Sequence, residues 1–141
     1  MPSPTIIRST ALALCLALPG WPAAAPAAGP TYTAGQAKRG QTSYQHWCQT
    51  CHGSDLDNGE FGGPPLRGSW FRSHWGNGDV GALFAYVRTA MPPDNPSGLN
   101  DTTYVDILAF ILQANGYPTG SAELPPDANA LSEMTLRREG P

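Results

Sequence analysis

Small and apolar residues recur at helical spacing from about 34 to 47, which predicts a first helix. Thr33 and Gln36 stand at its start in the pattern of a capping box. Gly40 and Tyr44 share one face of this helix. Since glycine inside a helix is less stable than alanine by about 1 kcal/mol, Gly40 indicates a close contact with another helix. An ordinary exposed glycine is the alternative.

The same spacing predicts two further helices. The second begins at Asp79 and ends before Met91-Pro92-Pro93, because a residue that precedes proline disfavours the α conformation. The third runs from about residue 100 to 115 and stops at Gly116. Their apolar stripes are formed by Val80, Leu83, Phe84, Val87, Tyr104, Ile107, Leu108 and Ile111. The expected fold class is therefore all-α, with three main helices and long connecting loops.

Two other regions lack a clear period. Residues 53–78 are rich in glycine, proline and aromatic side chains, so we expect an ordered loop there. Residues 119–141 are mostly polar, which predicts an extended C-terminal tail. Three apolar residues can hold parts of this tail against the domain: Leu124, Leu131 and Met134. No strand pattern and no internal repeat is evident.

The first 27 residues have the layout of a secretory signal peptide. Basic Arg8 precedes an apolar run over residues 10–18, and Ala25-Pro26-Ala27 offers small residues for cleavage after Ala27. The run is shorter than the roughly 20 residues of a permanent membrane helix, although an uncleaved anchor is the alternative. We expect a disordered segment at 28–32, a domain spanning 33–118, and a protein that is soluble in the periplasm after cleavage.

The charge of the chain is mildly acidic, at −3, and shows no run of basic residues. Lys38 is the only lysine. A nucleic-acid partner or an anionic membrane surface therefore finds no electrostatic support.

One pentapeptide carries recognisable chemistry: Cys48-Gln49-Thr50-Cys51-His52. Each thiol can add across one haem vinyl group to form a thioether, and the adjacent imidazole can then reach the iron. A structural zinc site needs two further ligands, usually at a similarly short spacing, and only the scattered His46 and His74 remain. A thioredoxin-like motif needs a βαβ context, which is missing. The pattern therefore favours one covalently attached haem c, with His52 as an axial ligand of its iron.

Several residues are candidates for the second axial ligand. Met91 is favoured, because a helix and two prolines hold its segment, whereas Met134 lies in the expected tail. His74 and an open or water-bound site are the alternatives. A thioether opposite an imidazole keeps the iron six-coordinate and raises its reduction potential, which suits electron transfer. An open position would instead suit the binding or reduction of a small molecule.

The region 53–78 also offers partners for a haem pocket. A carbonyl in the stiff turn at 62–68 can accept the remaining ring N–H of His52 and so fix its tautomer. Trp75 can donate its indole N–H to a haem propionate, with Arg67 or Arg72 as a counter-charge.

Five motifs follow one another in a fixed order: Gly40-x-x-x-Tyr44, Cys48-x-x-Cys51-His52-Gly53, Gly63-Pro64-x-Leu66-x-Gly68, Ala90-Met91-Pro92 and Tyr104-x-x-Ile107-x-Ala109-Phe110. In this order, over about residues 33–117, the chain resembles class I c-type cytochromes. The resemblance implies the cytochrome c fold, in which the first and last helices cross near Gly40 and Phe110. It also implies His52 and Met91 as the axial ligands and Pro64 as the carbonyl partner of His52.

The stretch from Met91-Pro92 to Asn115-Gly116-Tyr117-Pro118 also resembles small bacterial cytochromes associated with periplasmic dehydrogenases, including quinoprotein alcohol dehydrogenases. The resemblance implies a single-electron carrier, not an enzyme, that passes electrons from a dehydrogenase to a terminal oxidase or another cytochrome. Alternatives are a haem protein with a displaceable sixth ligand and an integral subunit of a dehydrogenase complex. The ring of exposed lysines usual in the family is missing, which argues against docking as in mitochondrial cytochrome c.

Overall fold

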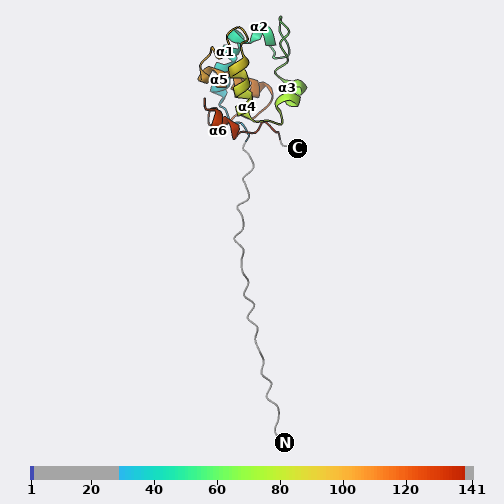
Figure 1. Ribbon diagram of the computed structural model, residues 1–141, viewed down its shortest axis with the longest axis vertical. Coiled ribbons are helices and arrows are strands. Elements are labelled where there is room, and N and C mark those ends of the chain that lie inside the picture. The colour runs from blue at the N-terminus through green and yellow to red at the C-terminus, as the bar shows by residue number, and fades with distance from the viewer. Residues whose placement is uncertain (2–28, 139–141) are drawn as a thin grey trace.

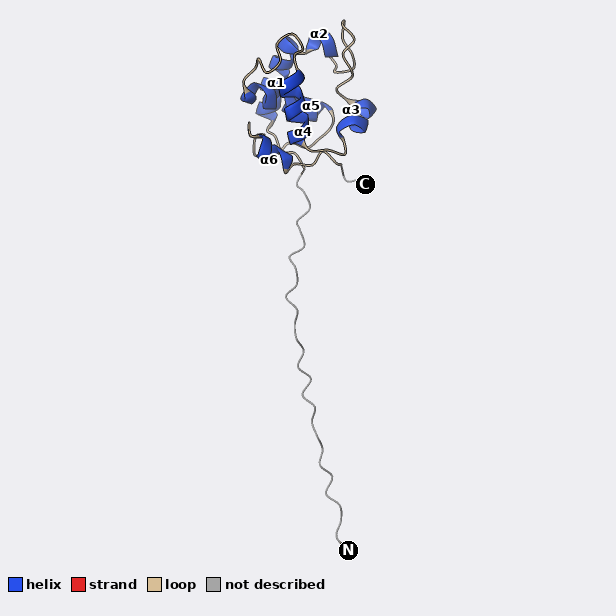
Figure 2. Cartoon of the chain, viewed as in Figure 1, coloured by secondary structure: helices blue, strands red, loops and turns tan. Residues whose placement is uncertain are grey.

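The computed structural model describes Met1 and residues 29–138, which form helices joined by loops (Figure 1). The helices are α1 (Ala34–Trp47), α2 (Gln49–His52), α3 (Gly68–Trp75), α4 (Val80–Ala90), α5 (Asp101–Ala114) and α6 (Ala128–Ser132). The described residues contain no strand (Figure 2). They form only an isolated bridge between Asp79 and Thr135. The predicted all-α class is confirmed. Apart from Met1, the expected signal peptide lies outside the described residues.

The three predicted helices begin within one residue of the predicted positions, because each start has a side-chain cap. Thr33, Asp79 and Asn100 are the N-caps of α1, α4 and α5. Each side chain accepts a hydrogen bond from the backbone N–H three residues later, at 3.0, 2.7 and 2.8 Å respectively. These bonds satisfy N–H groups that have no partner inside the helix. At the other end of α5, Gly116 has the positive φ of a helix stop, 75°.

Helices α1 and α5 cross in close contact. A β-carbon on Gly40 would overlap the backbone carbonyl group of Asp106, so the contact that Gly40 indicated is confirmed. One turn further along, the rings of Tyr44 and Phe110 pack with their centroids 5.2 Å apart. The core lies around this crossing: residues 104–112 of α5 are all buried except the half-buried Phe110.

The expectation of a continuous loop over residues 53–78 is wrong for the part that forms α3. This helix has no side-chain cap at Arg67 and buries only one residue, Phe71. It therefore leaves no amphipathic period in the sequence, because a period appears only where a helix buries a stripe of residues. In Figure 1, α3 lies apart from the group formed by α1, α4 and α5.

The C-terminal segment folds back onto the domain, which corrects the expected extended tail as far as residue 138. Leu124 and Leu131 are buried as expected, and Leu136 is buried too. The backbone N–H of Val80, at the start of α4, donates to the carbonyl of Met134 at 2.9 Å. A β-carbon on Gly81 would overlap the side chain of Ser132, so α4 and α6 pack without space between them.

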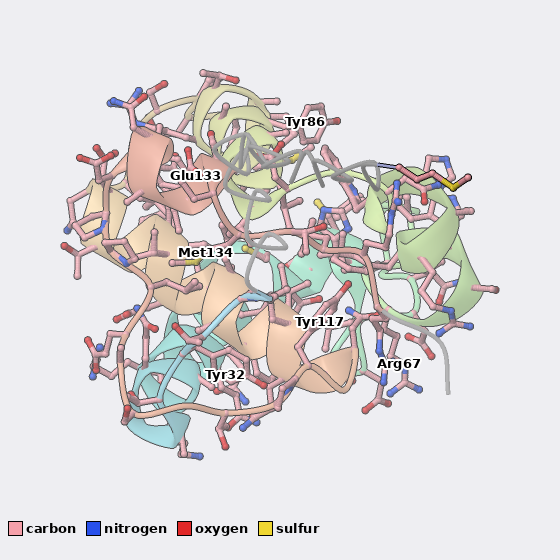
Figure 3. The ribbon with its side chains drawn as sticks, turned by 90° about the horizontal axis from the view of Figure 1, so that it is seen from below. Tyr32, Arg67, Tyr86, Tyr117, Glu133 and Met134 are labelled. Carbon is pink, nitrogen blue, oxygen red and sulfur yellow. The ribbon has the colours of Figure 1, made fainter. Side chains whose placement is uncertain are left out.

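The segment that leads into α1 is also anchored. Tyr32 is fully buried, and its hydroxyl donates to the carbonyl oxygen of Tyr117. The N–H of Gly120 donates to the carbonyl of Tyr32 at 2.8 Å. The expected disorder of residues 28–32 is therefore wrong at Tyr32. Figure 3 shows Tyr32 and Tyr117 in a view from below, where the chain enters α1 and leaves α5. None of the helices in the described part of the chain combines the length and apolar character that a membrane span requires.

Candidate haem-binding site

A cavity of about 1010 Å³ opens among α2, α3, α4 and the segment that follows α4. Most of its lining is apolar or aromatic, and among the described residues that line it Asp94 is the only Asp, Glu, Lys or Arg. The structure brings together around it six of the residues that the sequence singled out: Cys48, Cys51, His52, Pro64, Trp75 and Met91.

Cys48 and Cys51 reach this cavity because α1 ends at Trp47 and the chain forms one further turn, α2. Both are free thiols and half-buried. Burial raises the pKa of the Cys48 thiol to about 12, and the neighbouring Cys51 adds to the rise. Two thiols therefore face an apolar cavity from one short turn.

His52 is buried at the end of α2, with 7% of its surface exposed. Its Nδ1 lies 2.8 Å from the carbonyl oxygen of Pro64. Since a carbonyl can only accept, Nδ1 carries the proton and donates it. The lone pair of the neutral imidazole is then on Nε2, where it can bind a metal. The hydrogen bond expected between His52 and Pro64 is thus present.

Glycines allow the loop before Pro64 to lie against α2. The N–H of Gly63 donates to the carbonyl oxygen of Cys51 at 2.7 Å. A β-carbon on Gly63 would overlap that carbonyl, and one on Gly59 would lie 2.5 Å from the carbonyl oxygen of Thr50. Side chains at either position would push the loop, and the Pro64 carbonyl with it, away from His52.

Met91 is the C-cap of α4 and has an extended backbone, with a half-buried side chain. The hydroxyl of Tyr104 donates to its carbonyl oxygen at 2.8 Å, and the Met91–Pro92 peptide bond is cis. Met134, which is labelled in Figure 3, is absent from the cavity lining and instead packs against the core. Of these two methionines, only Met91 is placed to reach a group in the cavity.

The other candidates lie on the α3 side of the cavity. His74 lines the cavity as well, but its ring stacks on Trp70 with the centroids 3.8 Å apart. Its Nδ1 lies 2.8 Å from the carbonyl oxygen of Trp70. Trp75 is half-buried beside Tyr86, with ring centroids 5.4 Å apart; its bond to a propionate stays a prediction. The two suggested counter-charges, Arg67 and Arg72, are exposed and do not line the cavity.

Sequence reasoning missed two residues that support the site. Tyr104 was recognised in an apolar stripe and a family motif, but no role was predicted for its hydroxyl, which holds the Met91 segment. Asn115 was recognised at a helix end and in a resembling stretch, but no role was predicted for its buried amide, which bonds the backbone of Leu66 and Gly68 near Pro64. The sequence did offer one signal for both residues: each places a polar side chain near an end of a helix expected to be buried. A buried polar group needs a hydrogen-bond partner.

The residues around the cavity fit a covalently bound haem. Two thiols can form the thioethers, the buried imidazole has its tautomer fixed, and a thioether side chain comes from a separate segment. The apolar lining suits a macrocycle that must be kept from water. Fold and donor set together define the class of monohaem c-type cytochromes.

Comparison with known families agrees with this class. Residues 35–111 match the family model described as cytochrome C oxidase, cbb3-type, subunit III, and the chain belongs to this cytochrome c family. Membership implies a covalently bound haem c with iron, so the predicted cofactor and family are confirmed. No curated protein and no solved structure matches the chain.

Proposed function

We propose that the protein is a single-electron carrier in which His52 and Met91 are the axial ligands of one haem iron. The observation that carries this proposal is the presence of both side chains on the lining of one apolar cavity. Cys48 and Cys51 would hold the haem covalently. The haem would supply one-electron redox chemistry at its iron.

The residues around the site favour electron transfer over catalysis. His52 is held by the Pro64 carbonyl at 2.8 Å, which raises the basicity of its Nε2. The segment of Met91 is held by Tyr104. With both ligands restrained, electron gain and loss require little rearrangement, and no coordination position is left for a substrate. The apolar lining keeps water out and favours a high reduction potential.

We further propose that the protein works in the periplasm, between a dehydrogenase and a terminal oxidase or another cytochrome. The layout of the first 27 residues supports export. A second candidate is an integral subunit of an oxidoreductase complex, which the description of the family as an oxidase subunit favours. Purification of the native protein distinguishes the two, since a subunit elutes with its complex and a free carrier elutes alone.

The ferric absorption spectrum tests the ligation. We expect a low-spin spectrum with the weak red charge-transfer band of an iron–methionine bond. Met91→Ala should abolish this band, and the matched variant Met134→Ala should retain it, because Met134 lies outside the cavity. A high-spin spectrum of the unmodified protein, or rapid carbon monoxide binding after reduction, would contradict the proposal and favour a displaceable sixth ligand.

A further inference from the structure

The two segments that would carry the axial ligands are tied to opposite ends of α5. At the start of α5, Tyr104 is buried with 1% of its surface exposed. Its hydroxyl donates to the carbonyl oxygen of Met91 at 2.8 Å and accepts from the N–H of Leu99 at 3.4 Å. One side chain therefore contacts the segment between α4 and α5 at both of its ends.

At the other end of α5, Asn115 is the C-cap and is buried, with 8% of its surface exposed. Its Oδ1 accepts from the N–H of Gly68 at 3.0 Å, and its Nδ2 donates to the carbonyl of Leu66 at 2.9 Å. These bonds hold the turn immediately after Pro64, whose carbonyl receives the Nδ1–H of His52.

Helix α5 is itself closely packed into the fold. It packs against α1 without space for a side chain at Gly40, and eight of its 14 residues are buried. The two polar groups lie about three helical turns apart. A helix held in this way keeps their separation fixed, because close-packed interiors deform little.

We propose that Tyr104 and Asn115 are positioning residues, through which α5 holds the Met91 segment and the Pro64 turn at a fixed separation. This inference rests on the proposed His52 and Met91 ligation. Tyr104 restrains the backbone of the ligand opposite His52. Asn115 acts on His52 indirectly, because it holds the turn that keeps the Pro64 carbonyl within hydrogen-bond distance of His52.

Tyr104→Phe tests the Met91 side, because it removes only the hydroxyl. Tyr117→Phe is a matched control: Tyr117 is also buried and donates to a backbone carbonyl, that of Leu136, at 2.6 Å, outside the cavity. Imidazole is titrated into each ferric holoprotein and the loss of the iron–methionine band is followed. We expect Tyr104→Phe to raise the imidazole affinity about two- to tenfold, as one lost buried hydrogen bond would. Tyr117→Phe should leave the affinity unchanged.

Asn115→Ala tests the Pro64 side against Gln36→Ala. Gln36 is also a buried amide that bonds a backbone, that of Leu124, at 2.8 and 3.0 Å, and it does not line the cavity. Release of the Pro64 turn weakens the hydrogen bond at His52 Nδ1 and makes the imidazole a poorer donor to iron. We expect a higher reduction potential in Asn115→Ala and an unchanged potential in Gln36→Ala, measured by spectroelectrochemical titration.

Equal effects within each pair would overturn the inference, since they would show only a general loss of stability. Unchanged imidazole affinity in Tyr104→Phe, or an unchanged potential in Asn115→Ala, would overturn it for that residue. Failure of the proposed function gives a different result: the unmodified protein would lack the iron–methionine band, and the inference would fall with it.

Discussion

Gly40 in α1 lies so close to the carbonyl group of Asp106 in α5 that a β-carbon at residue 40 would overlap it. The atoms in the way belong to the backbone of a buried helix, so they cannot move aside as a flexible side chain would. The close crossing of α1 and α5 therefore requires glycine at residue 40. Its stability matters to the site because α1 leads directly into Cys48 and α5 supports both proposed ligand segments.

We expect Gly40→Ala to destabilise the protein by about 3 kcal/mol or more, because it forces apart two packed helices. This effect should exceed the gain of about 1 kcal/mol in helix propensity. Gly35→Ala is the control in the same helix, since the nearest atom to its β-carbon, Thr33 Oγ1, is 3.8 Å away. Gly35→Ala should be neutral or slightly stabilising in urea denaturation. Similar values for the two variants would show that the crossing tolerates a side chain.

Covalent attachment should depend on Cys48 and Cys51 individually. We expect Cys51→Ser to keep one thioether, so that the α band of the reduced pyridine complex moves to longer wavelength as one vinyl group stays unsaturated. The double variant should lose its haem in a denaturing gel. Cys15→Ser, in the expected signal peptide, is the control and should leave attachment unchanged. Loss of attachment in that control would contradict the assignment of the thioethers to the cavity cysteines.

The C-terminal segment up to residue 138 packs against the domain and should therefore contribute to the stability of the fold. Leu131 is fully buried where α6 meets α4, so Leu131→Ala should lower the free energy of unfolding by about 2–5 kcal/mol. Arg137→Ala, at an exposed position of the same segment, should change it by less than about 0.5 kcal/mol. An equally small change for Leu131→Ala would indicate that the segment detaches in solution.

Alkaline pH should destabilise the fold through its buried tyrosines. Burial is the main cause that raises the pKa of Tyr32, Tyr44 and Tyr117 above the ordinary value of 10.0. Because the folded state binds these protons more tightly than the unfolded state, the stability is fully present below about pH 10 and is lost as the pH rises above it. The thermal midpoint should therefore fall between about pH 10 and 12. In Tyr44→Phe the thermal midpoint should fall less steeply with pH. An unchanged dependence on pH would contradict the buried tyrosines as its cause.

How much the sequence could predict depended on the range of the interactions involved. The three main helices were predicted because Thr33, Asp79 and Asn100 cap helices through bonds to residues only three positions away. The packed C-terminal segment was not, since its order depends on contacts such as that of Gln36 with Leu124, 88 residues apart.

The same distinction applies to the site. Cys48, Cys51 and His52 form a local pattern, so haem attachment could be predicted once zinc and thioredoxin-like sites were excluded. Met91 was preferred to Met134 on the sequence alone, but part of the reason was mistaken. Met134 does not lie in an extended tail, because its segment packs against the core. The supporting role of Tyr104 could not be predicted, because a hydroxyl in an apolar stripe gives no sign of which carbonyl it will bond.

The pairing of Gln36 with Leu124 also bears on the order of events during synthesis. A chain that emerges from its N-terminal end presents α1 and the two cysteines long before residue 124 exists. Until then the buried amide of Gln36 in α1 lacks both of its backbone partners. At that stage the two thiols belong to an unfinished domain, which the C-terminal segment completes.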